Sequence, residues 1–311
     1  MNVPNTVLCI VGPTASGKTA LSVAAAKRFD GEIVSADAVS VYRGLNIGSA
    51  KPTIEERQGI PHHLIDCVDV TDAGFSVSVF RALARAAIDG IIAHGKLPVV
   101  VGGSGLYADA VFSDMGFSVP SDSSVRAALE AEYDRDQNAV FARLSASDPI
   151  TAARLHPNDK KRVVRALEVF TLTGRPFSEW NQAFERAQQN DGTYRTVKIG
   201  LSLPRETLYE RINRRVDQMM RDGLKAEAFD LFAQGYAPDC CTAMHSIGYT
   251  QLYELYCGRC TEEEAIEEIK LATRHFAKRQ MTWFKRDPQT IWIDPLSTPV
   301  ETLLDQIEEL L

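Results

Sequence analysis

The chain has 311 residues, of which 45% are hydrophobic and 24% are charged. This composition is typical of a folded globular protein and excludes a disordered chain, a collagen-like chain or a disulfide-rich scaffold. The formal net charge of -7 argues mildly against nucleic acid as a partner, but polyanions are bound by local patches rather than by an average charge.

The N-terminal residues predict no targeting segment. Residues 1–6 carry no basic region, and the apolar run 7–11 is too short for a signal-peptide core or a membrane span. Six cysteines without a secretion signal indicate reduced thiols. We therefore expect a cytoplasmic protein with no membrane partner.

Short β-branched runs alternate with helical stretches along the chain. Runs typical of buried strands lie at 6–11, 32–36 and 97–101, with further candidates at 197–203 and 290–293. Helical stretches at 18–28 and 80–93 lie between the first three runs. The alternation predicts an α/β fold with a parallel sheet covered by helices on both faces.

The region from about residue 117 to 194 has a different pattern. It lacks strand runs, and one clear helix begins after Asn158 or Asp159, which can cap it, and ends before Gly174. We interpret residues 118–195 as a helical insertion domain. Residues 1–117 and 196–311 then form the α/β core.

The most specific motif follows the first predicted strand. Residues 12–19 read GPTASGKT and fit the ATP-binding pattern G-x-x-x-x-G-K-[ST] in full, between a strand and a helix. In such loops, backbone N–H groups and a helix N-terminus converge on phosphate oxygens. Lys18 is expected to meet a diphosphate, and the Thr19 hydroxyl to bind Mg²⁺. The motif predicts phosphate binding without saying which bond breaks.

Two further loops follow predicted strands. Asp37 follows the second run and is expected to face the same cleft as the phosphate loop, because ligands bind beyond the carboxyl ends of parallel strands. The residues alone fit equally a helix cap, a turn aspartate or a carboxylate that organises a metal. Ser104, within VGGSGLY at 101–107, offers a ligand its hydroxyl or N–H group, or belongs to a tight turn that needs positive φ.

Basic residues are clustered despite the acidic balance, and residues 270–286 contain no acid. Three clusters favour a polyanion-binding surface over a merely solvated charged face. The clusters are Lys270, Arg274, Lys278, Arg279, Lys285 and Arg286; Lys160, Lys161, Arg162 and Arg165; and Arg211, Arg214, Arg215 and Arg221.

The cysteines and one histidine pair carry weaker signals. Cys257-x-x-Cys260 has zinc-knuckle spacing, but the adjacent Cys240 and Cys241 make a poor second pair and no His-x₃₋₅-His partner follows. We interpret these cysteines as structural. The pair at 62–63, His-His, is likewise interpreted as structural or turn residues.

Taken together, the motifs resemble the tRNA dimethylallyltransferases, also called tRNA isopentenylpyrophosphate transferases. The resemblance spans nearly the whole chain and is specific because seven stretches occur in order. They are GPTASGKT at 12–19, SADAVSVYRGLNIGSAKPT at 35–53, GIPHHLID at 59–66, VGGSGLY at 101–107, HPNDKKRVVRALEVFTLTGRPFSEW at 156–180, MHSIGYTQL at 244–252 and TRHFAKRQMTWFKR at 273–286.

The resemblance implies a fold and a reaction. The fold is a P-loop NTPase-like core with a helical insertion that contacts tRNA. The reaction transfers a dimethylallyl group from dimethylallyl diphosphate to N6 of the adenosine 3′-adjacent to the tRNA anticodon, with Mg²⁺ and release of diphosphate. The target base is flipped into a channel through the protein. We expect a monomer that binds the anticodon stem-loop.

The resemblance also assigns residues. Asp37 falls on the family's catalytic aspartate, and Lys18, Ser104 and Arg215 are the other expected catalytic side chains. The diphosphate site is expected at Gly12, Thr14, Ala15, Ser16, Gly17, Lys18 and Thr19, with Thr19 as the metal ligand. The tRNA-binding residues are expected to be Asp37, Ala38, Val39, Ser40, Ser104, Arg126, Lys161, Arg162, Arg165, His245, Ser246, Gly248, Tyr249, Lys278, Arg279, Gln280, Trp283 and Lys285.

The chain departs from the family pattern at a few positions. Residues 37–40 read Asp-Ala-Val-Ser where the family commonly has Asp-Ser-Met-Gln, which removes a hydroxyl and an amide beside the base. Ser49 and Ser104 replace threonines and keep the hydroxyl. The zinc finger of some eukaryotic members is absent, which favours a bacterial-type or organelle-type enzyme.

Three other functions are compatible with part of the pattern. An adenylate prenyltransferase of the cytokinin type modifies free AMP or ADP, and a free nucleotide does not need the basic helix at 270–286. A P-loop kinase of nucleotides or small molecules converts ATP to ADP, whereas the preferred function needs no ATP. A non-catalytic RNA-binding protein leaves the complete phosphate loop beside Asp37 unexplained.

Overall fold

The structure is a computed structural model that describes residues 5–72, 74–113, 119, 122–180 and 192–311. The chain divides into two compact units, Met1–Val111 with Gly192–Leu311, and Phe112–Asp191. The predicted boundary between residues 117 and 118 lies outside the described residues. Each unit is described by itself, and each has its own apolar core.

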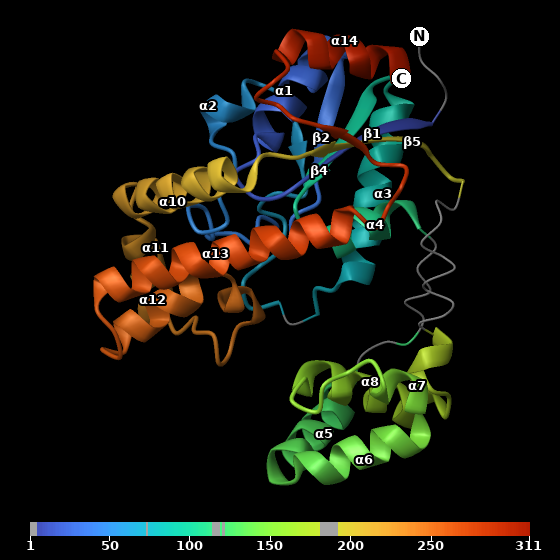
Figure 1. Cartoon of the computed structure of the whole chain (residues 1–311), viewed down its shortest axis with the longest axis vertical. Helices are drawn as coiled ribbons and strands as arrows, with labels where there is room; N and C mark the ends of the chain where they lie inside the picture. Colours follow the sequence, from blue (N-terminus) through green and yellow to red (C-terminus); the bar gives the residue numbers. More distant parts are fainter. Residues whose placement is uncertain (1–4, 73, 114–118, 120–121, 181–191) are drawn as a thin grey trace. The chain divides into compact units, whose positions relative to one another are not determined.

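The larger unit is built on a six-stranded parallel sheet of order β3-β2-β4-β1-β5-β6 (Figure 1). The strands are β1 (Thr6–Val11), β2 (Gly31–Ser35), β3 (His62–His63), β4 (Leu97–Gly102), β5 (Arg195–Leu201) and β6 (Ile291–Ile293). Every pairing is parallel. The predicted α/β class is confirmed, and the histidine pair at 62–63 forms the edge strand β3.

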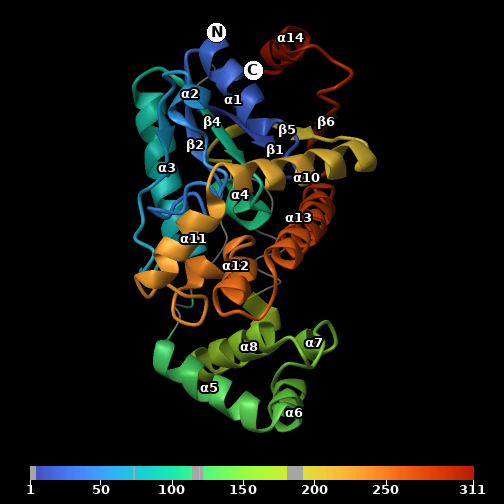
Figure 2. The same ribbon diagram turned by 90° about the vertical axis from the view of Figure 1, so that its left-hand side faces the viewer.

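Helices cover both faces of this sheet (Figure 2). The connections β1 to β2 and β3 to β4 run in opposite directions along the sheet, so right-handed crossovers place α1 and α3 on opposite faces. The helices of the unit are α1 (Lys18–Arg28), α2 (Ile54–Arg57), α3 (Val77–Ala93), α4 (Gly105–Phe112), α10 (Arg205–Arg221), α11 (Leu224–Ala233), the 3-10 turn η1 (Thr242–His245), α12 (Tyr249–Tyr256), α13 (Glu262–Phe284) and α14 (Val300–Leu310).

Two apolar cores hold the larger unit together. One lies between the sheet, α1 and α14, where all six residues of β1 are buried. The other joins the segment at 39–47 to α10, α11, α12 and α13. The loops that follow β1, β2 and β4 lie between these two cores, at the carboxyl edge of the sheet where α/β proteins bind ligands.

The smaller unit is helical in its described part. It contains α5 (Ser123–Arg135), α6 (Gln137–Ser147), α7 (Pro149–Ala152) and α8 (Lys160–Thr173). Its helices begin after aspartates whose side chains accept backbone N–H bonds, as predicted for Asp159, and α8 ends at Gly174 with φ 68°.

Within the residues that the structure describes, no helix is both long enough and apolar enough to cross a bilayer.

Candidate active site

The loop after β1 has the geometry of an anion cradle. Gly17, at φ 97°, caps the N-terminus of α1, a conformation that favours glycine. No acidic side chain lies in the first turn of α1, so its N–H groups present an uncompensated positive end. The Ser16 Oγ atom is buried and has no hydrogen-bond partner among the described residues. Each feature favours a bound phosphate group.

Lys18 and Arg215 place two cations beside this loop. The Lys18 Nζ atom donates to the Pro13 carbonyl oxygen at 2.6 Å. Burial and the nearby Arg215 guanidinium lower the pKa of Lys18 to about 7, against the opposite effect of Asp37. Arg215, from α10, donates to the Ala50 carbonyl at 3.4 Å. Two partly desolvated cations in one place are a ready counter-charge for a diphosphate.

Asp37 is both a turn residue and a pocket residue. Its Oδ1 atom accepts from the backbone N–H groups of Val39 and Ser40 at 2.8 and 3.0 Å. Its Oδ2 atom makes no hydrogen bond within the described part of the chain. The turn therefore fixes one carboxylate oxygen and leaves the other for chemistry.

Ser104 and Ser40 support the loop that carries Asp37. The Ser104 Oγ atom accepts from the Ala38 N–H group at 3.0 Å, so the glycine turn after β4 holds the loop after β2. The buried Ser40 hydroxyl lies 3.1 Å from the Ser35 hydroxyl. Ser104 thus positions the aspartate loop.

A cavity of about 450 Å³ lies between these loops and α10 and α13. It brings together many of the residues that the sequence predicts for the site. Those lining it are Thr14, Lys18, Thr19, Asp37, Ala38, Val39, Ser40, Ser104, Arg215, His245, Ser246, Gly248, Arg279 and Gln280. Apolar side chains, including Ile212, Met219 and Phe276, complete the wall.

A second cavity of about 390 Å³ lies on the outer side of the phosphate loop. It is lined by Ala15, Ser16 and Gly17 together with Arg211. Lys18, Thr19 and Arg215 line both cavities. The phosphate loop and Arg215 therefore contribute to both cavities.

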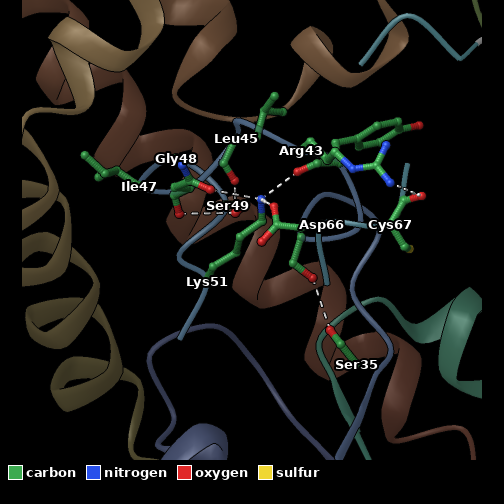
Figure 3. A network of polar contacts seen from close by, with 12 residues as sticks. Ser35, Arg43, Leu45, Ile47, Gly48, Ser49, Lys51, Asp66 and Cys67 are labelled. Atoms are coloured by element: carbon green, nitrogen blue, oxygen red, sulfur yellow. Dashed lines mark hydrogen bonds and ion pairs between the residues drawn. The ribbon is translucent and has the colours of Figure 1, made fainter. Parts of the chain in front are cut away.

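Lys51 stabilises the loop that forms another wall of the first cavity (Figure 3). Its side chain is only 5% exposed, and Nζ donates to the Tyr42 carbonyl at 2.5 Å, Asn46 Oδ1 at 3.2 Å and Asp66 Oδ1 at 2.6 Å. Full pairing of a buried cation favours one conformation of the loop.

Glu227 holds the same loop, although no sequence motif marks it. From α11, its carboxylate accepts from the backbone N–H groups of Asn46, Ile47 and Gly48 at 2.9–3.1 Å and from the Tyr249 hydroxyl at 2.6 Å. Burial and this carboxylate raise the pKa of Tyr249. No local pattern pairs Glu227 with a loop about 180 residues earlier.

We expect Glu227→Gln to lower the free energy of unfolding by about 1–3 kcal/mol, because an amide nitrogen then faces backbone donors and leaves them unsatisfied. Urea unfolding measures the change. Glu210→Gln, at an exposed position of α10, is the matched control and leaves stability unchanged. Equal stability of the Glu227 and Glu210 variants would contradict the clamp.

Several residues predicted to contact tRNA have structural partners. Tyr249 is fully buried, and its hydroxyl donates to the Glu227 carboxylate. The Trp283 Nε1 atom donates to Asp109 Oδ2 at 2.7 Å. In the smaller unit, Arg126 and Arg165 both bind the buried Glu168 carboxylate at 2.8 Å. These side chains are engaged with the protein in this structure.

The basic clusters also contain two kinds of residue, those paired within the protein and those exposed to solvent. On α13, Lys270 pairs with Asp217 and Glu267, and Arg274 donates to Asn213. Lys278, Arg279 and Lys285 are exposed, as are Lys161 and Arg162 of the smaller unit, although Arg162 pairs with Asp159. The exposed members are the ones available to a polyanion.

Comparisons with known proteins agree with this geometry. The family model described as IPP transferase matches residues 40–287. This chain belongs to the IPP transferase family. It is 44% identical over 306 residues to a tRNA dimethylallyltransferase of Geobacillus thermodenitrificans, covering 98% of this chain and 94% of that protein. It is 47% identical over 289 residues to tRNA dimethylallyltransferase 2 of Geotalea uraniireducens, covering 93% and 92%.

Solved structures of IPP transferases share the fold. The tRNA isopentenylpyrophosphate transferase of Bacillus halodurans matches with a TM-score of 0.71 and 41% identity over 99% of this chain and 95% of that one. A eukaryotic dimethylallyltransferase, described as acting on tRNA, matches with a TM-score of 0.76 and 29% identity over 93% of this chain and 74% of that one. The P-loop-like core expected from the sequence is thus shared with the solved structures from Bacillus halodurans and from a eukaryote.

Proposed function

We propose that this IPP transferase transfers a dimethylallyl group from dimethylallyl diphosphate to N6 of the adenosine 3′-adjacent to the tRNA anticodon, and releases diphosphate. The observation that carries the proposal is that Lys18 of the phosphate loop and Asp37 line one cavity. An RNA-binding protein without catalytic activity needs neither feature, and a kinase of small molecules is distinguished by its requirement for ATP. Both curated relatives described above are named as tRNA dimethylallyltransferases, which disfavours the adenylate-type alternative.

The phosphate loop stabilises the leaving group. As the C1–O bond breaks, its electron pair stays on the diphosphate, and negative charge increases on the bridging oxygen. The N–H groups at the start of α1, Lys18 and Arg215 line the place where that charge develops and stabilise it. Lys18 and Arg215 exchange their bonds to the Pro13 and Ala50 carbonyl oxygens for bonds to the diphosphate.

Asp37 prepares the nucleophile. The N6 lone pair of adenine is delocalised into the ring, so the amine attacks only if it is oriented and loses a proton as the C–N bond forms. The free Oδ2 atom of Asp37 accepts that proton, while the Val39 and Ser40 N–H groups hold Oδ1. Carbon C1 forms a bond to nitrogen as its bond to oxygen breaks. Asp37 takes the proton and the diphosphate keeps the electron pair, so the charges balance.

The residues of the loop fit Mg²⁺. Magnesium prefers hard oxygen ligands and is often held by few protein groups together with substrate phosphates. The Thr19 hydroxyl lines both cavities, and the described residues hold no group of three or more His, Cys, Asp or Glu side chains that would make a separate metal site. Thr19 and diphosphate oxygens would hold the ion, which supplies further neutralisation of the leaving group.

The target base of the tRNA is flipped out of the anticodon loop and enters the cavity. A base in the anticodon loop is unpaired, so its extrusion costs less than flipping from a duplex. The exposed cations of α13 offset that cost by binding RNA phosphates, and the smaller unit, with exposed Lys161, is proposed to contact tRNA as well. We place the reaction in the cytoplasm, carried out by a monomer.

Incubation with dimethylallyl diphosphate, Mg²⁺ and unmodified tRNA, followed by nucleoside mass analysis, tests the proposal. The expected product is N6-(dimethylallyl)adenosine with diphosphate released and no requirement for ATP. Parallel reactions with AMP and ADP distinguish the adenylate-type transferase. Modified AMP without modified tRNA would overturn the assignment of substrate.

Removal of single charges on α13 is expected to weaken tRNA binding and flatten its salt dependence. For Lys278→Ala or Arg279→Ala, the slope of log Kobs against log salt becomes less steep by about 0.7–0.9, because one phosphate contact is lost. Titrations at several salt concentrations measure the slope. Lys27→Ala, in the last turn of α1, is the control that leaves it unchanged. An unaltered slope for both α13 variants would assign Lys278 and Arg279 to a solvated face.

A further inference from the structure

Gln280 joins two segments of the active site to α13. It is buried, with 5% of its surface exposed. Its Oε1 atom accepts from the backbone N–H group of Thr14 in the phosphate loop at 2.9 Å. Its Nε2 atom donates to the carbonyl oxygen of Gly103 in the glycine turn at 2.9 Å. The two partners lie 266 and 177 positions away in the sequence.

The chemistry of the two partners requires a primary amide of this length. The Thr14 backbone N–H group is a donor and the Gly103 carbonyl oxygen is an acceptor. The side chain between these two groups must therefore accept at one end and donate at the other. A carboxylate repels the Gly103 carbonyl, and an ammonium group repels the Thr14 N–H group. The approach is also close, because a Cβ atom at Gly103 would lie 2.3 Å from Nε2.

The contact sets the conformation of both loops. The Thr14 N–H group is turned toward α13, which fixes the peptide from which the rest of the phosphate loop continues to Ser16 and Lys18. Gly103 precedes Ser104, which holds the Ala38 N–H group and hence the loop of Asp37. One side chain thus orients the diphosphate cradle and, through Ser104, the proposed base.

Other contacts fix this end of α13 to the same region. Trp283 donates to Asp109 of α4 at 2.7 Å, and Asp109 and Asp287 bind Lys198 of β5 at 3.1 and 2.8 Å. The exposed Lys278 and Arg279 lie on the turn that carries Gln280. RNA-facing cations and the phosphate loop are therefore joined through one short stretch of helix.

We propose that Gln280 is a positioning residue that holds the phosphate loop and the glycine turn in register, rather than a contact for tRNA as the family resemblance implies. The proposal rests on the function proposed above for the identity of the substrates. It does not depend on that function for diphosphate binding, which inorganic diphosphate reports directly.

The test compares Gln280→Leu and Gln280→Glu with wild type. We expect kcat/KM for dimethylallyl diphosphate to fall by about tenfold to a hundredfold, because a small misplacement of the reacting groups is costly. Affinity for inorganic diphosphate falls in the same variants. The tRNA Kd stays within about twofold and the salt slope is unchanged, whereas Lys278→Ala makes the slope less steep. Gln234→Glu, at an exposed position directly after α11, is the matched control and changes none of these quantities.

The pH profile of Gln280→Glu separates positioning from a general loss of packing. Burial at this position raises the pKa of the glutamic acid, and its protonated carboxyl group accepts and donates like the amide, so the activity of this variant relative to wild type rises as the pH is lowered through that pKa. Gln280→Leu shows no such recovery. The comparison of Gln280→Glu with wild type still decides the matter if the leucine variant does not fold.

Two results would overturn the proposal. One is unchanged affinity for inorganic diphosphate in both Gln280 variants. The other is a tRNA Kd raised about tenfold with unaltered diphosphate parameters, which would make Gln280 an RNA contact. Failure of the proposed function is distinct, because wild type would then yield no modified nucleoside whatever the Gln280 variants do to diphosphate binding.

Discussion

Asp37→Asn is expected to lower the turnover number by about 10²–10⁴-fold, the usual contribution of a general base. The amide oxygen of the asparagine can still accept from the Val39 and Ser40 N–H groups, so the loop keeps its shape. What is lost is the second oxygen that takes the proton from N6. Single-turnover transfer to tRNA, measured at saturating dimethylallyl diphosphate, reports the chemical step.

Binding measurements separate this effect from damage to the site. Affinities for tRNA and inorganic diphosphate are expected to stay within a few fold in Asp37→Asn, because neither depends on proton removal. Ser104→Ala provides a graded comparison, since it removes only the acceptor for the Ala38 N–H group. Turnover of Asp37→Asn within a few fold of wild type would show that Asp37 is not the base.

The parts of the fold that were predicted correctly depend on local patterns. The run at 6–11 and the helix at 18–28 were placed at the bounds that the structure shows, because a buried strand, a glycine loop and a helix follow one another there. Asp37 is a turn aspartate and also lines the cavity that Lys18 lines, so these two placements are compatible, and its role as the base stays a prediction. Local signals also sufficed for Asp159 as the cap of α8.

The parts that could not be predicted depend on contacts between distant segments. Glu227 and Gln280 are ordinary polar residues of amphipathic helices, and only the folded chain brings them to backbone groups about 180 and 266 positions away. The ion pairs of two predicted tRNA-binding residues could not be predicted for a related reason. A sequence shows that Arg126 and Arg165 are cationic but not that Glu168 lies between them, buried and fully paired.

Lys18→Met is expected to lower turnover by about 10²–10³-fold, because it removes a charged donor aimed at the departing diphosphate. The same substitution is expected to abolish the proton uptake that accompanies diphosphate binding. With a pKa of about 7 in the free protein, Lys18 is mostly neutral at pH 8, and a bound diphosphate raises its pKa again. Binding at pH 8 therefore takes up a proton, whereas binding at pH 6 takes up almost none.

The sign of the linkage gives two observable slopes. Affinity for dimethylallyl diphosphate falls as pH rises above about 7, because an increasing share of the binding energy is used to protonate Lys18. The free protein, in contrast, becomes more stable relative to Lys18→Met between about pH 7 and pH 10, since the unfolded lysine binds more protons there than the folded one. Calorimetric titration in buffers of different ionisation enthalpy measures the uptake. The same proton count in wild type and in Lys18→Met would show that the proton goes elsewhere, and that Lys18 already carries its charge before the diphosphate arrives.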